Sequence, residues 1–308
     1  MEFELLDIKN DYVFKRIFGE KEDILIHFLN SVLNYPEDEK IISLTYLNTE
    51  INKDQEDDKE TRLDVLAKLN NESYVNIEIQ VQNTYEYEKR CLYYWAKLYE
   101  QQLTSGKKYK TLKPAICIHI LNFNFFKDKE YFMTKIKPLD TETRKVFSHD
   151  FQLYFLEVHK IPDQYYNELD KWMHFFKGAS KETVMAMQTP EIEKAFSTLE
   201  YISQDPVARA KYEARRKYEL DYNTDMDGAR EEGLQIGFTK GFQNGKNEGE
   251  QLGFVKGKDE GVQLGFAKGK NDQKLEIAKN LLINNFSIEM ISKLTDLPIS
   301  EIEKLKNT

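Results

Sequence analysis

Asp64, Glu78 and Gln80 are the residues whose types and spacing best fit a catalytic, metal-binding site. Two carboxylates can share a divalent metal, and Mg²⁺ prefers one or two carboxylates together with waters and substrate oxygens. The backbone carbonyl of Ile79 would add a further oxygen, and Gln80 would contact a scissile phosphate or the attacking water. Such a site fits phosphodiester hydrolysis, in which a metal polarises the phosphate and activates a water. The spacing alone leaves a second interpretation open, because many hairpins carry Asp and Glu on a solvated face.

A β-hairpin is the element that would bring these side chains together. Residues 62–69 and 74–82 both alternate apolar and polar residues, which is the period of a β-strand. The two asparagines between these runs are typical of a turn, because asparagine tolerates positive φ. If the turn centres near Asn71, the numbers of opposed residues add up to about 142, and Asp64 lies opposite Glu78. Opposed side chains have Cβ atoms about 4.5–5.5 Å apart, so the two carboxylates repel each other unless a cation lies between them.

Further helices and strands surround the hairpin in a pattern typical of an α/β fold. Two helices are expected within residues 10–34, where apolar residues recur at spacings of three and four. Pro114–Leu121 and Phe151–Val158 are short apolar runs of the kind found in strands buried on both faces. Together with a strand at 40–51 and a helix at 85–104, this order predicts a sheet of mixed strand directions.

The segment from Lys89 to Lys113 is the most basic part of this half of the chain. It contains seven Lys or Arg residues and one acid, a net charge of +6. One interpretation is that it contacts phosphates of nucleic acid beside the metal site, through Arg90, Lys107 and Lys108 among others. The alternative is an ordinary solvated helix face in a lysine-rich protein.

Composition narrows the class of protein. The chain has 308 residues and a net charge of −9, which argues against a protein that coats nucleic acid through bulk charge. Its two cysteines, Cys91 and Cys117, are too few and too far apart for a disulfide framework or a zinc site. The N-terminus lacks the apolar core of a secretion signal, and no run approaches the roughly 18 apolar residues of a membrane span. We therefore expect a cytoplasmic protein without a membrane partner.

Glycine recurs at every fourth position from Gly233 to Gly269, ten times without a miss. In a straight α-helix each step of four residues turns this stripe by about 40°, so the stripe circles the helix and cannot form one flat docking face. Each glycine also disfavours the helix by about 1 kcal/mol relative to alanine. The charged residues between the glycines exclude a membrane dimer motif. We interpret this stretch as a long, weakly helical spacer, with self-association into a homo-oligomer as the alternative.

These patterns divide the chain into four segments. They are an α/β core at 1–160, a helical extension at 161–227, the glycine-repeat helix at 228–272 and a small helical module at 273–308. In the last segment Ser287 and Ser300 are expected to cap helices, because each is followed by a glutamate within three residues. This module resembles a helix-turn-helix bundle, which serves either for compact packing or for recognition of DNA or a partner.

Several short motifs extend beyond the two acids of the hairpin. They are Asp11-x-x-Phe14-Lys15 with Ile17-Phe18-Gly19, Phe28-Leu29-Asn30, Asn76-Ile77-Glu78-Ile79-Gln80, Arg90-x-x-Tyr93-Tyr94, and Gln101-x-Leu103 followed by Gly106-x-x-Tyr109. Together with Asp64 they resemble the PD-(D/E)XK nuclease superfamily. Within it the chain looks like the Rpn family of recombination-promoting nucleases, also known as PD-(D/E)XK nuclease family transposases. The glycine repeat and the closing module look like the C-terminal end of that family.

This resemblance implies a restriction-endonuclease-like mixed sheet and a metal-dependent DNA endonuclease. Its partner would be double-stranded DNA, its cofactor Mg²⁺ or Mn²⁺, and its role recombination or phage defence. Carried over to this sequence, Asp64 and Glu78 are the metal ligands, with the carbonyl of Ile79 as a further ligand. Gln80 completes the catalytic set, at the position of the superfamily's lysine.

Two positions depart from the superfamily pattern. Gln80 stands where a lysine is expected, and Leu63 replaces the usual proline. Because an amide can neither carry charge nor act as a base, either a lysine or arginine from elsewhere compensates or the amide merely orients water. The candidates for compensation are Lys15, Arg90 and Lys108, and Asp11 and Lys107 complete the set of DNA-binding or auxiliary residues. The alternative function is a DNA-binding or self-assembling module with a nuclease fold and little catalysis.

Overall fold

The computed structural model describes residues 4–51, 61–83 and 86–306, so the predicted solvated loop 52–60 lies outside the described residues. The chain divides into two compact units, one that ends at Tyr222 and one that begins at Asn223. The first unit contains the sheet and the helices around it.

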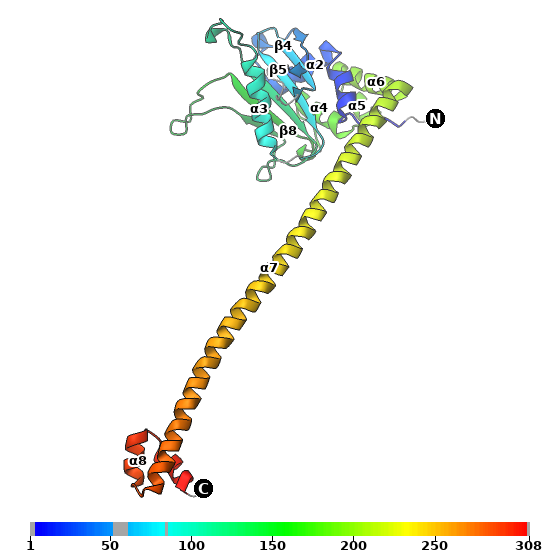
Figure 1. Cartoon of the computed structure of the whole chain (residues 1–308). Helices are drawn as coiled ribbons and strands as arrows, with labels where there is room; N and C mark the ends of the chain where they lie inside the picture. Colours follow the sequence, from blue (N-terminus) through cyan, green and yellow to red (C-terminus); the bar gives the residue numbers. More distant parts are fainter. Residues whose placement is uncertain (1–3, 52–60, 84–85, 307–308) are drawn as a thin grey trace. The chain divides into compact units, whose positions relative to one another are not determined.

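A six-stranded mixed sheet forms the centre of the first unit (Figure 1). Its strands, in spatial order, are β1 (Leu44–Tyr46), β4 (Val65–Leu69), β5 (Tyr74–Gln80), β6 (Ala115–Leu121), β8 (Phe151–Glu157) and β7 (Met133–Ile136). The three strands β5, β6 and β8 run parallel, whereas β1, β4 and β7 pair antiparallel with their neighbours. The predicted α/β fold with mixed strand directions is therefore confirmed.

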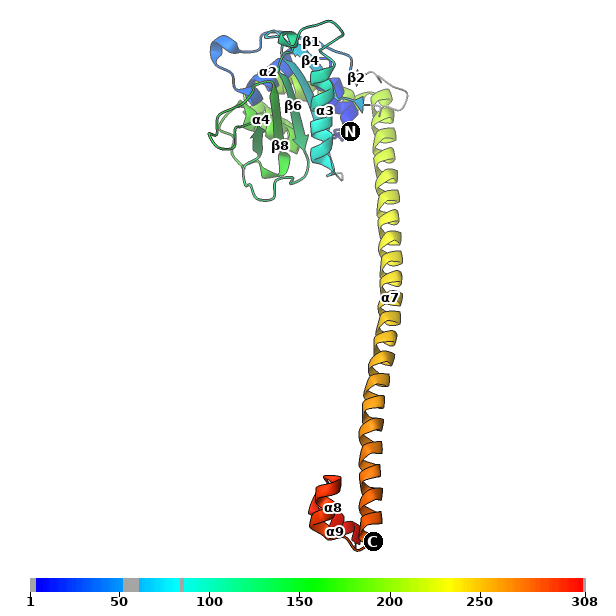
Figure 2. The same ribbon diagram turned by 60° about the vertical axis from the view of Figure 1, so that its left-hand side comes forward.

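Helices cover both faces of this sheet, because its strands carry apolar residues on both sides. One face packs against α1 (Asp11–Phe18), α2 (Glu22–Leu33), α4 (Glu168–Lys177), α5 (Lys181–Ala186) and α6 (Pro190–Gln204), and the other against α3 (Tyr87–Glu100). Val75 and Ile77 of β5 belong to the first core, and Leu66 and Cys117 belong to the core beneath α3. Figures 1 and 2 show α3 running alongside the strands on its side of the sheet.

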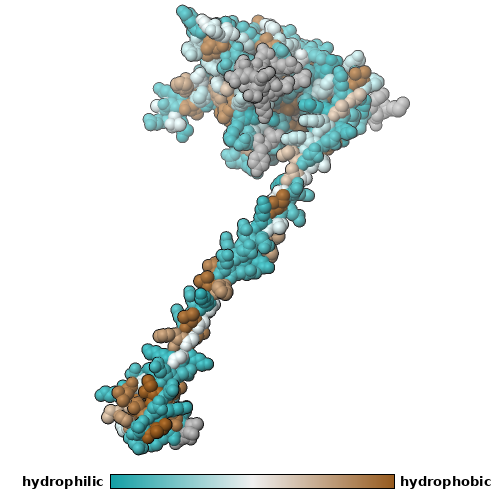
Figure 3. Space-filling model, viewed as in Figure 1, coloured by the Kyte–Doolittle hydropathy of each residue, from teal (hydrophilic) through white to brown (hydrophobic). Residues whose placement is uncertain are grey.

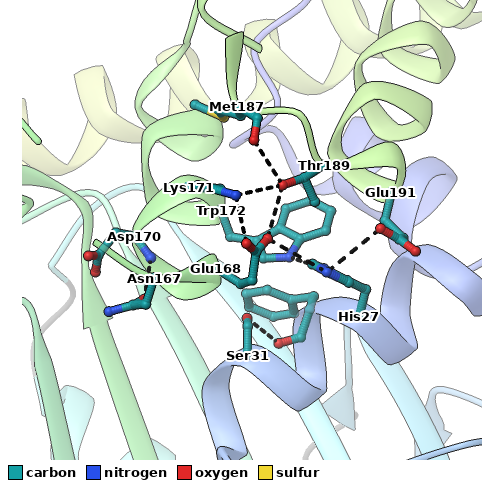
Figure 4. A network of polar contacts seen from close by, with 11 residues as sticks. His27, Ser31, Asn167, Glu168, Asp170, Lys171, Trp172, Met187, Thr189 and Glu191 are labelled. Carbon is teal, nitrogen blue, oxygen red and sulfur yellow. Dashed lines mark hydrogen bonds and ion pairs between the residues drawn. The ribbon is translucent and has the colours of Figure 1, made fainter. Parts of the chain in front are cut away.

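A polar network ties the later helices to α2 (Figure 4). The indole N–H of Trp172 in α4 donates to Nδ1 of His27 in α2 over 3.0 Å. Lys171 donates to Glu168 over 2.6 Å and to the hydroxyl of Thr189 over 3.0 Å, and this hydroxyl donates to Glu168 over 3.0 Å. Thr189 is the residue before α6, so one cluster joins three helices. The residues predicted as a helical extension thus share one core with the strands.

The ends of several elements differ from the sequence predictions. The single strand expected at 40–51 is in fact β1 and a separate two-residue strand, β2 (Glu50–Ile51), which pairs with β3 (Thr61–Arg62). In the hairpin turn the residue with positive φ is Glu72, at 68°, and not an asparagine. Asn71 instead accepts a hydrogen bond from the backbone N–H of Ser73, which is the local bond that makes asparagine a turn residue.

A 78-residue helix, α7 (Pro206–Ile283), begins in the first unit and contains the ten glycines. Apart from its chain neighbours and the backbone of its own helix, a Cβ atom at any of these glycines would meet no atom of the described chain within 4 Å. Large apolar residues along the repeat are exposed, among them Phe238, Phe254 and Phe266. Figure 3 shows hydrophilic and hydrophobic side chains interleaved along the visible face of this helix. Among the described helices none is long and apolar enough to cross a membrane.

The C-terminal helices form a small core of their own. The end of α7 packs with α8 (Ile288–Thr295) and α9 (Ile299–Lys306) around Ala278, Ile291 and Ile302. Ser287 caps α8 as predicted, because its hydroxyl accepts a hydrogen bond from the N–H of Met290. The prediction for Ser300 is wrong, since α9 already begins at Ile299.

Candidate active site

Asp64 lies at a bend immediately before β4, where the chain enters the six-stranded sheet. One carboxylate oxygen accepts a hydrogen bond from the backbone N–H of Ile79 over 2.9 Å, and the other lies 3.0 Å from the ammonium group of Lys15. Burial raises the pKa of Asp64, and the positive charge of Lys15 and the bond from Ile79 oppose this rise. The side chain is thus fixed by strand β5 on one side and helix α1 on the other.

Glu78 lies in the middle of β5, on the face covered by α3, and is only 7% exposed. Its carboxylate accepts hydrogen bonds from the side-chain amide of Asn76 over 3.2 Å and from the backbone N–H of Asp64 over 3.3 Å. Burial raises the pKa of Glu78 from 4.5 to about 8, and the negative charge of Asp64 adds to the effect. The hydrogen bonds from backbone N–H groups favour the charged form of each acid, but burial and the closeness of the two carboxylates make it costly to ionise both together.

The register of the hairpin explains why these acids meet. β4 and β5 pair Val65 with Ile77 and Leu66 with Asn76, so the numbers of paired residues add up to 142 as expected. Continued by one residue, this register sets Asp64 opposite Glu78. The alternative interpretation, a solvated face, is wrong for this side of the hairpin: Asn76 is fully buried and Glu78 nearly so, because α3 covers this side of the sheet.

Gln80 at the end of β5 is bound by a side chain of α3. The guanidinium group of Arg90 donates to Oε1 of Gln80, and the amide of Gln80 donates to the carbonyl of Gln82 over 3.0 Å. Arg90 also lies over the rings of Tyr87 and Tyr94, at 5.0 and 5.7 Å from their centres. Its charge is therefore held at the end of the strand by a hydrogen bond and two aromatic faces.

Asp11 and Lys15 lie one turn apart on α1, close to Asp64. The Lys15 ammonium is 3.9 Å from Asp11, and Asp11 in turn binds Arg215 of α7 through contacts of 2.9 and 3.0 Å. Arg215 is not among the residues predicted from the sequence. Its segment carries only a charged, helix-favouring pattern, and no local signal links it to a residue about 200 positions earlier.

The rest of the basic segment lies elsewhere. Lys107 and Lys108 are exposed in the connection between α3 and β6, and among the contacts of the described residues neither touches Asp64, Glu78 or Gln80. Lys113 pairs with Glu72 at the start of β5, the opposite end of the strand from Gln80. Of the basic residues predicted in this segment, the structure brings Arg90 to the acids.

A groove of about 570 Å³ opens beside Asp64. Its walls come from α1 and from the first turns of α7, and it is lined by Asp11, Tyr12, Lys15, Asp64, Lys211, Ala214, Arg215 and Tyr218. Of the two acids, Asp64 is therefore the one that lines the groove. Within the described part of the chain no group of three or more His, Cys, Asp or Glu side chains could hold a metal ion. A metal at this site would therefore rely on backbone, substrate and water oxygens as well as the two acids.

Comparison with known proteins supports the resemblance seen in the motifs. A family model described as PD-(D/E)XK nuclease family transposase matches residues 8–229. No curated protein and no solved structure matches the chain. The matched range includes the sheet, the acids and the first turns of α7, and it ends before the glycine repeat. Because the match covers well over half of the sequence, the chain belongs to the PD-(D/E)XK nuclease family transposases.

Proposed function

We propose that this protein is a metal-dependent DNA endonuclease in which Asp64 and Glu78 hold the metal. Family membership implies a nuclease with a DNA substrate, and PD-(D/E)XK nucleases generally use divalent metal ions. The observation that carries the proposal for these residues is the buried pair itself. Each acid accepts a hydrogen bond from backbone beside the other, and burial raises both pKa values. A divalent cation bound between them would remove the repulsion that makes their joint ionisation unfavourable.

The donor set fits a hard divalent cation such as Mg²⁺ or Mn²⁺. The N–H of Ile79 points toward Asp64, and in an extended strand the N–H and C=O of one residue point to the same side. The carbonyl of Ile79 is therefore available on the same edge as the two carboxylates. When bound, such a cation polarises a phosphate and lowers the pKa of a water.

Arg90 supplies the positive charge that Gln80 lacks. A guanidinium stays protonated at neutral pH and binds phosphate oxygens well, so Arg90 can stabilise the charge that develops on the scissile phosphate. Gln80 fixes it through their hydrogen bond. The amide nitrogen of Gln80 donates one N–H to the carbonyl of Gln82, and its second N–H can orient a water. Lys15, at 3.0 Å from Asp64, adds a second cation on the opposite side of the acids.

A plasmid cleavage assay tests this proposal. Supercoiled plasmid should be nicked by the wild-type protein with Mg²⁺ or Mn²⁺ and left intact in EDTA. Asp64→Ala and Glu78→Gln should each abolish nicking, and Asp128→Ala, an exposed acid on a loop, should leave it unchanged. Equal cutting by wild type and Asp64→Ala would show that the activity belongs to another site or to a contaminant.

The biological setting follows the resemblance. We propose double-stranded DNA as partner, recombination or phage defence as role, and the cytoplasm as location. A second candidate function is a DNA-binding or self-assembling module with weak catalysis, favoured by the glutamine at the lysine position and by the long glycine-repeat helix. It predicts salt-sensitive DNA binding that Asp64→Ala leaves unchanged, with no cleavage in any divalent metal.

A further inference from the structure

The groove beside Asp64 brings part of the long helix to the candidate active site. Its volume of about 570 Å³ lies within the range of pockets that hold small ligands. Three of its residues, Lys211, Arg215 and Tyr218, follow spacings of four and three along α7 and so lie on one face of the helix. A molecule bound against this face would also touch Asp64.

Cations and aromatic rings alternate in this groove. The ammonium group of Lys211 lies 5.7 Å from the centre of the Tyr12 ring, and the guanidinium of Arg215 lies 5.8 Å from that of Tyr218. Tyr218 is 62% exposed, so much of its ring remains open to a ligand. Such a combination of basic groups and open aromatic rings is the pattern of surfaces that bind single-stranded nucleic acid.

Lys211 and Arg215 differ in whether they form an ion pair with an acid. Arg215 pairs with Asp11 through two contacts, so the charge of Asp11 in the groove is neutralised. The same contacts hold the guanidinium group beside Tyr218. Lys211 makes no ion pair among the contacts of the described residues, and it faces the groove. The ammonium of Lys211 is therefore the group available to a phosphate.

We propose that this groove binds an unpaired nucleotide next to the scissile phosphate, with its base on Tyr218 and a backbone phosphate on Lys211. The proposal rests on the nuclease function proposed for Asp64 and Glu78, and it narrows the substrate class. Inside a duplex both faces of a base are covered by its neighbours, so a base can lie on Tyr218 only if it is unstacked. The preferred substrate is then DNA that is opened beside the cut, such as a forked duplex, and not a continuous duplex.

Binding to matched oligonucleotides tests this preference. The Glu78→Gln protein, which binds without cutting, is titrated by fluorescence anisotropy against a duplex and against the same duplex opened into a fork. Stacking of one base strengthens binding by about 5- to 150-fold, so the fork should bind tighter by a factor in that range. Adding Tyr218→Leu should remove the preference and Tyr218→Phe should keep it. Tyr201→Leu, at an exposed tyrosine of α6 outside the groove, should have no effect.

A fluorescence reporter shows whether the base lies where we propose. In Tyr218→Trp the new indole keeps an aromatic platform, and a stacked base should quench its emission with the fork but not with the duplex. Equal affinity for fork and duplex, or a preference that survives Tyr218→Leu, would overturn the inference. The plasmid assay separates the two proposals. Metal-dependent nicking without a fork preference removes only this inference, and a fork preference without nicking removes only the nuclease assignment.

Discussion

Replacing the buried acid Glu78 with glutamine should change how the stability of the first unit depends on pH. Burial raises the pKa of Glu78 in the folded chain to about 8, from 4.5. Between these two values the folded protein holds a proton that the unfolded chain has lost. The free energy of unfolding therefore falls as pH rises through this window, and the loss is complete above the folded pKa.

The size of this effect follows from the two pKa values. They differ by about 3.5, and each pKa unit corresponds to about 1.4 kcal/mol, so ionising Glu78 in the folded state costs up to about 5 kcal/mol. Glu78→Gln has no proton to lose and its carbonyl can still accept the bond from Asn76. We expect the variant to be more stable than wild type at pH 8.5 and to differ little at pH 5.

Urea unfolding followed by tryptophan fluorescence is the suitable assay, because Trp95 and Trp172 both lie in the first unit and report on it alone. The measurement is made in EDTA at both pH values, with the exposed-loop variant Glu142→Gln as control for a generic loss of charge. Addition of Mn²⁺ or Mg²⁺ at pH 8.5 should then recover part of the wild-type stability, about 2.7 kcal/mol at one hundred times the dissociation constant, and leave Glu78→Gln unchanged. An identical pH dependence in wild type and Glu78→Gln would refute the reasoning.

Three further predictions concern other parts of the chain. Arg90→Gln should lower kcat for DNA cleavage by about 100- to 1,000-fold through loss of charge stabilisation, and adding Gln80→Lys should recover part of it in the plasmid assay. Trp172→Phe removes the donor to His27 and should destabilise the first unit by about 1–3 kcal/mol in urea unfolding. A chain that ends at Asp227 retains the nuclease unit and should keep wild-type cleavage, and light scattering of both chains shows whether the glycine repeat holds subunits together.

The sequence predicted the structure well where a regular spacing of apolar residues ended at a recognisable turn or cap residue. The alternation in β5 identified its two faces, and the position of the asparagines fixed the register that opposes Asp64 to Glu78. Helices were expected within residues 10–34, and α1 indeed begins there, with the side chain of Asn10 accepting the N–H of Tyr12. These features depend on neighbours within a few residues, which is the range over which a sequence pattern carries information.

Burial and long-range contact were not predictable in the same way. A period of two separates the faces of β5 but does not say what covers each face, so a solvated face for Asn76 and Glu78 remained open as an alternative. The strand β7 was missed because its four residues show no clear alternation. Arg215 reaches Asp11 only because the whole helical segment folds back on α1, and no spacing in the sequence expresses this.

The pairing of Gln80 with Arg90 limits what chemistry the site can use. An arginine stays protonated across physiological pH, and a glutamine amide does not ionise, so neither can accept a proton from the attacking water. Together they reproduce the positive charge of the superfamily's lysine but not its capacity to act as a base. The hydrogen bond and the two tyrosine rings hold the guanidinium in place before substrate arrives, which reduces the reorganisation needed in the transition state. In the proposed site the residues at the end of β5 would therefore supply charge and orientation, and removal of the proton would depend on how strongly a cation held by the acids acidifies the water.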